Sequence, residues 1–332
     1  MKYKKCMLAL IAMIGLMNVG CSDVKQSENT DLKTEESENV YHPIDIIPKT
    51  DNKAIGVFYY ESNGDGTCSI IDCVDEEEVT VPEYSPDGDK VVSLNFSATK
   101  YKVKTVIIPK TVTKIGEFCF QYWTALEKIE LPDSIEKIEQ RAFYHCPKLK
   151  DVTFSNGLKS INEEAFEDCT ALTEIHIPEG CENIYRNAFS GCTALKVVDL
   201  PQSLRQLHYY AFSGCVSLTT IGLKANLSIG NGVFYRCTSL TEVILDDGLE
   251  EIGESAFEKT GIRKIFIPKS VARINRFAFM GCFDDLTIYC EAESKPETWD
   301  DSWNHKGNDE AFKTVWKATR ASVEWLKGVN EL

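Results

Sequence analysis

The most regular feature of the hydrophobic pattern is a phenylalanine that returns every 22 or 23 residues. The phenylalanines are Phe120, Phe143, Phe166, Phe189, Phe212, Phe234, Phe257 and Phe279. Most of them follow an alanine, and in most units a cysteine comes three residues after the phenylalanine. These cysteines are Cys146, Cys169, Cys192, Cys215, Cys237 and Cys282. One unit of this length cannot bury its apolar face alone, so the units must stack and share a core.

The segments between the phenylalanines predict short strands. Ile129-Glu130-Leu131 alternates between apolar and polar positions, which is typical of a strand with one buried face. Pro132 ends this strand, because proline cannot donate to a continuing ladder. Later in the same unit, residues 139–143 predict one helical turn that directs Ala142 and Phe143 inward. We therefore expect an α/β repeat solenoid with a parallel sheet on one side and short helical turns and irregular segments on the other.

The ends of the repeat array should carry caps, because the end coils of a solenoid expose core. The turn sequence Asn63-Gly64-Asp65-Gly66 lies between apolar runs and predicts a β-hairpin. Residues 78–82 and 91–96 look like a degenerate first repeat. Near the C-terminus, the apolar residues between Phe312 and Leu326 are compatible with a helical stripe.

The N-terminus has the composition of a targeting segment. Lysines among the first five residues precede an uncharged apolar run from Cys6 to Val19, which is too short for a comfortable membrane span. The following Gly20-Cys21 resembles the end of a bacterial lipoprotein signal, which implies lipidation of Cys21 as the mature N-terminus. An ordinary secretory signal is the alternative. Residues 21–48 are polar and acidic, and we interpret them as a disordered tether.

The charge balance narrows the classes of partner. The 332-residue chain carries a formal net charge of −15. Nucleic acid binding and electrostatic docking on anionic lipid both need a positively charged surface, and this chain is strongly negative. We therefore expect no nucleic acid partner, and contact with a membrane only through the lipid anchor.

The cysteines and histidines do not form a recognisable reactive site. The six cysteines of the repeat lie 22 or 23 residues apart, or a multiple of that, without a Cys-x-x-Cys pair, so we expect buried free thiols rather than a metal site. Pairing between Cys68 and Cys73 stays open. The chain has no His-Glu-x-x-His, no Gly-x-Ser-x-Gly and no phosphate loop. We expect a non-enzymatic protein with no catalytic residues, cofactor or metal.

The repeat itself resembles a known family. The unit L-x-x-I-x-L-P-x-S-[IL]-x-x-I-x-x-x-A-F-x-x-C is clearest at residues 126–146 and 195–215. It resembles the BspA-type leucine-rich repeat of bacterial surface proteins, over residues 103–290. The resemblance implies a right-handed coil with its parallel sheet on the concave face, and it makes Thr314–Trp316 a strand, as the alternative to the helical stripe. The array would then lie between a β-rich N-terminal cap over 49–102 and a C-terminal cap over 291–332. It also implies surface display, binding of host or neighbouring-cell proteins, and no catalysis.

The outward positions of the predicted concave strands are the candidate ligand-binding residues. Ile244, Phe266 and Tyr289 occupy equivalent positions in consecutive units, so stacking would join them into an apolar patch that suits an interaction site. The alternative is that the C-terminal cap covers this patch, through Trp299 or Trp303. The other candidate residues on this face are Glu242, Lys264, His176 and Asp199, of which the last two would suit a polar rim.

Three functional hypotheses follow from these observations. The first is an extracytoplasmic, outer-membrane or cell-surface lipoprotein that binds extracellular or host proteins as an adhesin does. The second is a glycan-binding surface lipoprotein, with Tyr289 and Phe266 near Glu242 as the binding residues. The third is an enzyme or inhibitor module, which would require a deep pocket with convergent polar groups.

Overall fold

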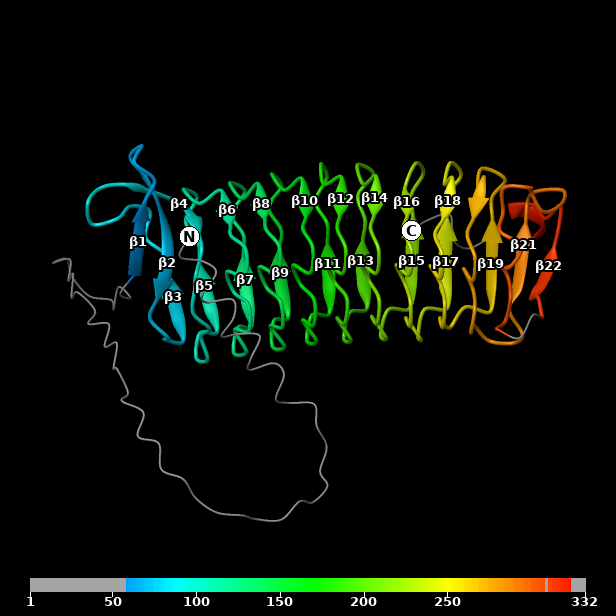
Figure 1. The fold of residues 1–332 in the computed structure, drawn as a ribbon, viewed down its shortest axis with the longest axis horizontal. Coiled ribbons are helices and arrows are strands. Elements are labelled where there is room, and N and C mark those ends of the chain that lie inside the picture. The colour runs from blue at the N-terminus through cyan, green and yellow to red at the C-terminus, as the bar shows by residue number, and fades with distance from the viewer. Residues whose placement is uncertain (1–57, 308–309, 324–332) are drawn as a thin grey trace, which may run out of the picture. The chain divides into compact units, whose positions relative to one another are not determined.

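The computed structural model describes residues 58–307 and 310–323, which form a solenoid of stacked coils. The predicted signal (1–20), Cys21 and the predicted tether (21–48) lie outside the described residues. Most coils contribute one strand to each of two faces, and these strands stand side by side along the row (Figure 1). We call the two faces sheet I and sheet II.

Sheet I contains the strands that the sequence pattern predicts. They run parallel in four hydrogen-bonded ladders, β3-β5-β7-β9, β11-β13, β15-β17 and β19-β21-β22. Each partner is the equivalent residue of the next repeat, as in Lys128 beside Asp151. The strands are β3 (Glu78–Thr80), β5 (Thr105–Ile107), β7 (Lys128–Glu130), β9 (Asp151–Thr153), β11 (Glu174–His176), β13 (Val197–Asp199), β15 (Thr220–Leu223), β17 (Glu242–Leu245), β19 (Lys264–Ile267), β21 (Thr287–Cys290) and β22 (Lys313–Val315).

Sheet II is a continuous eleven-stranded sheet that the sequence pattern did not reveal. All its neighbouring strands are parallel except β1 and β2, which form the antiparallel hairpin predicted from the turn at residues 63–66. The strands are β1 (Phe58–Ser62), β2 (Thr67–Cys73), β4 (Lys90–Leu94), β6 (Lys114–Ile115), β8 (Lys137–Ile138), β10 (Ser160–Ile161), β12 (Asn183–Ile184), β14 (Gln206–Leu207), β16 (Ser228–Ile229), β18 (Glu251–Ile252) and β20 (Arg273–Ile274).

The predicted helical turns are wrong, and so is the α/β class. Among the described residues the only helix is the 3₁₀ turn η1 (Arg320–Ser322). The segment around Phe143 instead alternates in handedness, with positive φ of 54° at Arg141 and 55° at His145. This conformation aims backbone groups at the neighbouring coil, so the amide of Phe143 donates to the carbonyl of Ala165 at 2.7 Å. The fold is a parallel β-solenoid. The backbone groups of its turns hydrogen-bond to the neighbouring coil instead of forming helical turns.

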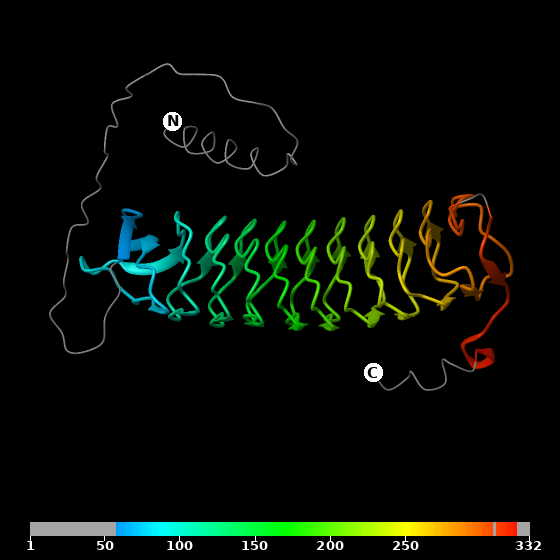
Figure 2. The same cartoon turned by 90° about the horizontal axis from the view of Figure 1, so that it is seen from below.

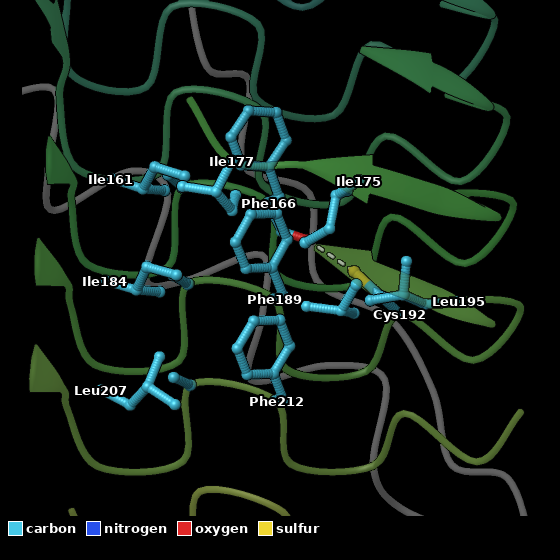
Figure 3. Packing of buried hydrophobic residues seen from close by; sticks show 14 of the residues in the cluster. Ile161, Phe166, Ile175, Ile177, Ile184, Phe189, Cys192, Leu195, Leu207 and Phe212 are labelled. Carbon is cyan, nitrogen blue, oxygen red and sulfur yellow. Dashed lines mark hydrogen bonds between the residues drawn. The ribbon is translucent and has the colours of Figure 1, made fainter. Parts of the chain in front are cut away.

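The repeated phenylalanines form a stacked column in the core, as the pattern predicts. Phe189 lies between Phe166 and Phe212, with ring centroids 5.3 Å away on either side and ring planes within 7° of parallel. Figure 3 shows these rings between apolar side chains of the two sheets, such as Ile175 of sheet I and Ile184 of sheet II. Every ring of the column is fully buried. The column therefore ties all the coils into one core.

Two different structures close the column. At the N-terminal end, Phe96 stacks against Trp123, which occupies the place of the repeat cysteine. At the C-terminal end, Trp303 packs edge-on against Phe279 and Trp299 packs against Trp303. The backbone of this segment forms the orange end of the row of coils in Figure 2. Residues 313–315 form β22, which pairs with β21. The described part of the tail thus takes the strand alternative.

Candidate interaction surface

Sheet I presents two parallel rows of outward side chains, at the first and third positions of its strands. The register places Glu174 beside Val197 and His176 beside Asp199 in neighbouring coils. Row 1 consists of Thr105, Lys128, Asp151, Glu174, Val197, Thr220, Glu242, Lys264 and Thr287. Row 2 consists of Ile107, Glu130, Thr153, His176, Asp199, Gly222, Ile244, Phe266 and Tyr289. The strand geometry thus brings the candidate ligand-binding residues onto one face.

The middle of this face is polar and open. His176 and Asp199 are both exposed, with Nδ1 and Oδ2 2.5 Å apart. Asp151 and Glu174 are exposed as well, and neither side chain makes a hydrogen bond or ion pair within the described part of the chain. Exposed Val197 adds an apolar contact point among them. Asp151, Glu174 and Val197 are therefore available to a partner, because the fold makes no use of these three side chains, whereas His176 and Asp199 already pair with each other.

The C-terminal end of the face differs from the predicted exposed patch. Phe266 is only 3% exposed and packs against Ala318 and Val323, while Tyr289 is partly covered by the same cluster. The predicted alternative, coverage by the C-terminal cap, is therefore the one that the structure supports. The covering segment is 318–323, however, since Trp299 and Trp303 belong to the main core.

Arg320 holds this covering segment in place. Its guanidinium lies 5.1 Å from the centre of the Phe266 ring. Nη2 also donates to the carbonyl of Leu245 at 2.5 Å and to Asp247 at 3.1 Å. Sequence reasoning missed Arg320, because nothing in the local pattern marks a contact between residues 75 positions apart.

The three remaining candidates lie on β17 and β19 beside the covered end, and Ile244 is half-buried. Glu242 is half-buried and accepts a hydrogen bond from the Thr220 hydroxyl at 3.4 Å. Lys264 is exposed and lies in register with Thr287. Burial of Phe266 removes the aromatic platform that a glycan site on this part of sheet I would need. The hypothesis of glycan binding through Phe266 and Tyr289 loses its structural basis.

The cysteines contribute to the core rather than to this surface. All eleven described cysteines are buried and free, including Cys68 and Cys73. Each thiol of the repeat series donates to the carbonyl of a core phenylalanine in the preceding coil, as Cys192 does to Phe166 at 3.2 Å (Figure 3). Burial raises the pKa of the Cys169 thiol to about 12 and that of Cys282 to about 11. Such thiols are poor nucleophiles and poor ligands at neutral pH.

The described residues offer neither a cluster of metal ligands nor a membrane-spanning helix. No group of three or more His, Cys, Asp or Glu side chains in residues 58–307 and 310–323 is arranged to hold a metal ion. The same part of the chain contains no helix long and apolar enough to span a membrane.

Comparison with known proteins identifies similar repeats. The family model of the BspA type leucine-rich repeat region matches residues 92–189 and 171–284, with six copies. A leucine-rich repeat protein from Bacteroides ovatus is 32% identical, with a TM-score of 0.68; the match covers 79% of this chain and 70% of that one. No curated protein sequence matches the chain.

Two further solved structures are more distant. The leucine-rich repeat protein of T. pallidum is 26% identical over 61% of this chain and 86% of its own, with a TM-score of 0.46. A leucine-rich cell surface protein from Faecalibacterium prausnitzii is 22% identical over 83% of this chain and 97% of its own, with a TM-score of 0.34. Neither structure superposes closely on this chain.

Proposed function

Because this chain belongs to the BspA type leucine-rich repeat family, we propose that it is a non-enzymatic surface protein that binds other proteins through sheet I. The partners are proteins of a host or of neighbouring cells. The observation that carries the proposal is the open centre of rows 1 and 2, where Asp151, Glu174 and Val197 are exposed and take no part in holding the fold together. A solenoid displays such a row over many coils, which suits an extended partner surface.

The charges of sheet I indicate the character of the partner. Rows 1 and 2 carry the carboxylates of Glu130, Asp151, Glu174, Asp199 and Glu242 against the ammonium groups of Lys128 and Lys264. Lys128 is also paired with Glu130 at 2.7 Å, so it neutralises one of these carboxylates. The face is therefore negative overall, and a basic protein surface complements it.

A binding assay with matched charge reversals tests this proposal. The full chain, purified in a non-ionic detergent, is passed over immobilised extracellular matrix proteins at low and physiological salt. We expect binding, and we expect Asp151→Lys/Glu174→Lys to weaken it at least about tenfold, with a loss of salt dependence. The control Glu136→Lys/Glu250→Lys changes the charge equally at exposed positions outside rows 1 and 2. Equal effects of the two double variants would refute the role of sheet I.

The attachment of the protein is the second part of the proposal. We infer that Cys21 carries a lipid and that residues 22–48 hold the folded repeats away from an outer membrane or cell surface. The apolar run before Gly20-Cys21 and the polar composition after it support this inference. Metabolic labelling with a radioactive fatty acid should mark the full chain but not its Cys21→Ser variant. Equal labelling of both would exclude this anchor.

A further inference from the structure

Sheet II contains a surface that differs from the rest of the solenoid. The outward side chains of its consecutive strands β10, β12, β14 and β16 are Ser160, Asn183, Gln206 and Ser228. The register places Asn183 directly beside Gln206, and Gln206 beside Ser228. This row, which we call the amide row, bears no formal charge, although the chain as a whole carries −15.

Three of the four side chains of the amide row have no hydrogen-bond partner, whereas Ser160 donates to Asn162 at 3.5 Å. Within the described part of the chain, the side chains of Asn183, Gln206 and Ser228 make no hydrogen bond. The same positions on either side carry charged side chains, which are Lys114 and Lys137 on one side and Glu251 and Arg273 on the other. Lys114 reaches Glu139 at 3.0 Å toward the N-terminus. Toward the C-terminus, the Glu251 carboxylate lies 3.7 Å from the guanidinium of Arg273.

Aromatic rings lie beside the amide row. Tyr185 and His208 follow Asn183 and Gln206 by two residues, so strand alternation directs them to the same face. Their rings stack with centroids 4.6 Å apart and planes within 17°. Tyr209 is 55% exposed and adds a third ring, next to the position where Gly230 has no side chain. None of these three side chains has a hydrogen-bond partner among the described residues.

The chemistry of this surface selects one class of ligand. Side-chain amides and hydroxyls both donate and accept hydrogen bonds, as do the hydroxyl groups of a sugar. Aromatic rings offer a flat apolar face for the C–H side of a sugar ring. Burial lowers the pKa of His208, which keeps this ring uncharged at neutral pH. Adjacent strands are about 4.8 Å apart, comparable to the length of one sugar unit in an extended chain.

We propose that the amide row and the rings of Tyr185, His208 and Tyr209 form a binding site for a neutral polysaccharide, which runs across β10–β16. The free amides of Asn183 and Gln206 bind successive hydroxyl groups, and the rings hold one edge of the chain. A charged polymer would gain nothing from this uncharged row. The site lies on the other sheet from the proposed protein-binding face, so it goes beyond the proposed function and is independent of it.

Affinity electrophoresis tests the site directly. The full chain, in a non-ionic detergent, migrates through gels that contain xyloglucan, galactomannan, laminarin or dextran, and through gels that contain polygalacturonate. We expect at least one neutral polysaccharide to retard the protein, and polygalacturonate to retard it less. Asn183→Ala/Gln206→Ala and Tyr185→Ala/His208→Ala should each weaken the affinity at least about tenfold.

A matched aromatic pair provides the control. Tyr122 and Tyr144 also come from neighbouring coils, with ring centroids 5.5 Å apart, but they lie in the turns between the two sheets and not on the strands of sheet II. Tyr122→Ala/Tyr144→Ala should therefore leave the retardation unchanged. Since Asn183 and Gln206 have no side-chain hydrogen bonds, their double variant should melt at the temperature of the wild type.

Several outcomes would overturn the proposal. They are no retardation by any neutral polysaccharide, stronger retardation by polygalacturonate, and equal retardation of the wild type and the amide variant. A change in the sedimentation coefficient of the unliganded protein on Tyr185→Ala/His208→Ala would overturn it as well, because the face would then bind a second copy of the chain.

Discussion

The thiols of the repeat cysteines combine two roles that are rarely joined in one small side chain. They fill the space beside the phenylalanine column, and they donate to carbonyls that the alternating backbone leaves inside the core, as Cys146 does to Phe120 at 3.0 Å. Alanine would fill less of that space and would leave the carbonyl without its donor. The structural role of these cysteines follows from the backbone bonds between coils, and it requires the thiol form.

We expect the eleven described cysteines to be unreactive in the folded protein. Burial raises the thiol pKa of Cys169 and Cys192, so the thiolate that attacks a disulfide reagent is scarce there at pH 8, and all eleven thiols are shielded from the reagent. Treatment with a thiol reagent, followed by peptide mapping, should find Cys169 and Cys192 unmodified until guanidinium unfolds the chain. Thr170→Cys, on an exposed turn, is the positive control. If Cys192 in the folded protein were labelled as fast as this introduced cysteine, the prediction that the repeat cysteines are buried and unreactive would be wrong.

Glu167 predicts a dependence of stability on pH. Burial, with smaller contributions from the neighbouring Glu164 and Asp168 carboxylates, raises its pKa from 4.5 to about 7. The folded state therefore holds this proton more tightly than the unfolded state, and its contribution to stability is present below pH 4.5 and is lost as the pH rises to about 7. Glu167→Gln cannot ionise, so its melting temperature should equal that of the wild type at pH 4 and exceed it at pH 8. The same change at exposed Glu163 serves as control, and a pH-independent difference for Glu167→Gln would exclude the effect.

The turns between the two sheets show where sequence reasoning succeeds and fails. The inward positions of Ala142, Phe143 and Cys146 were predicted correctly, because apolar residue types at a regular spacing indicate buried positions directly. The same spacing fits one turn of helix, however, and the pattern could not distinguish it from the observed backbone. Most residues at positive φ in these turns are not glycine; Arg141 and Ser255 are examples. Their residue types therefore do not predict this backbone conformation. The strands of sheet II were missed because each has only two residues in the repeats.

Gly214 tests the alternating turn. Its φ is +73°, and an added Cβ would approach no atom closer than 3.7 Å, so substitution would introduce backbone strain without a clash. Gly214→Ala should lower the free energy of unfolding by about 1 kcal/mol. Ser255→Gly, at a φ of 54°, should change it in the opposite direction by a smaller amount. Gly222→Ala in β15 is the control, because that glycine has room for a Cβ and no positive φ. Urea unfolding checks all three, and equal destabilisation by the two alanine variants would refute the strain argument.

The order of the coils was predictable from the repeat, whereas the closure of their C-terminal end was not. Repetition itself encodes the register, since each residue of sheet I pairs with its equivalent in the next unit. The contacts of the C-terminal cap occur only once in the chain, so no repeat pattern predicts them. Arg320 reaches Leu245 across two coils, and its ring contact with Phe266 buries the residue that the repeat pattern placed at the surface. The candidate surface therefore shifts toward the middle of sheet I, where the repeat alone determines which side chains face outward.

Removal of the Arg320 side chain should open this cap without unfolding the solenoid. Arg320→Ala removes the bond to the Leu245 carbonyl and the cation–π contact with Phe266, which together contribute about 2 kcal/mol or more. The contact energies of a solenoid act between neighbouring units, so this loss should stay near residues 318–323 and β19–β21. Hydrogen exchange should become at least about tenfold faster in peptides from that region, while peptides from β7–β13 exchange as in the wild type.

The control for this experiment is Arg263, whose guanidinium also lies over an aromatic ring and pairs with a carboxylate. It contacts Phe283 at 3.9 Å and Asp285 at 2.5 Å, but both partners are exposed. Arg263→Ala should therefore leave exchange in residues 318–323 unchanged, because exposed pairs contribute little. Faster exchange along the whole array in Arg320→Ala would show that the cap supports every coil. Unchanged exchange would show that Ala318 and Val323 hold the segment on Phe266 without the arginine.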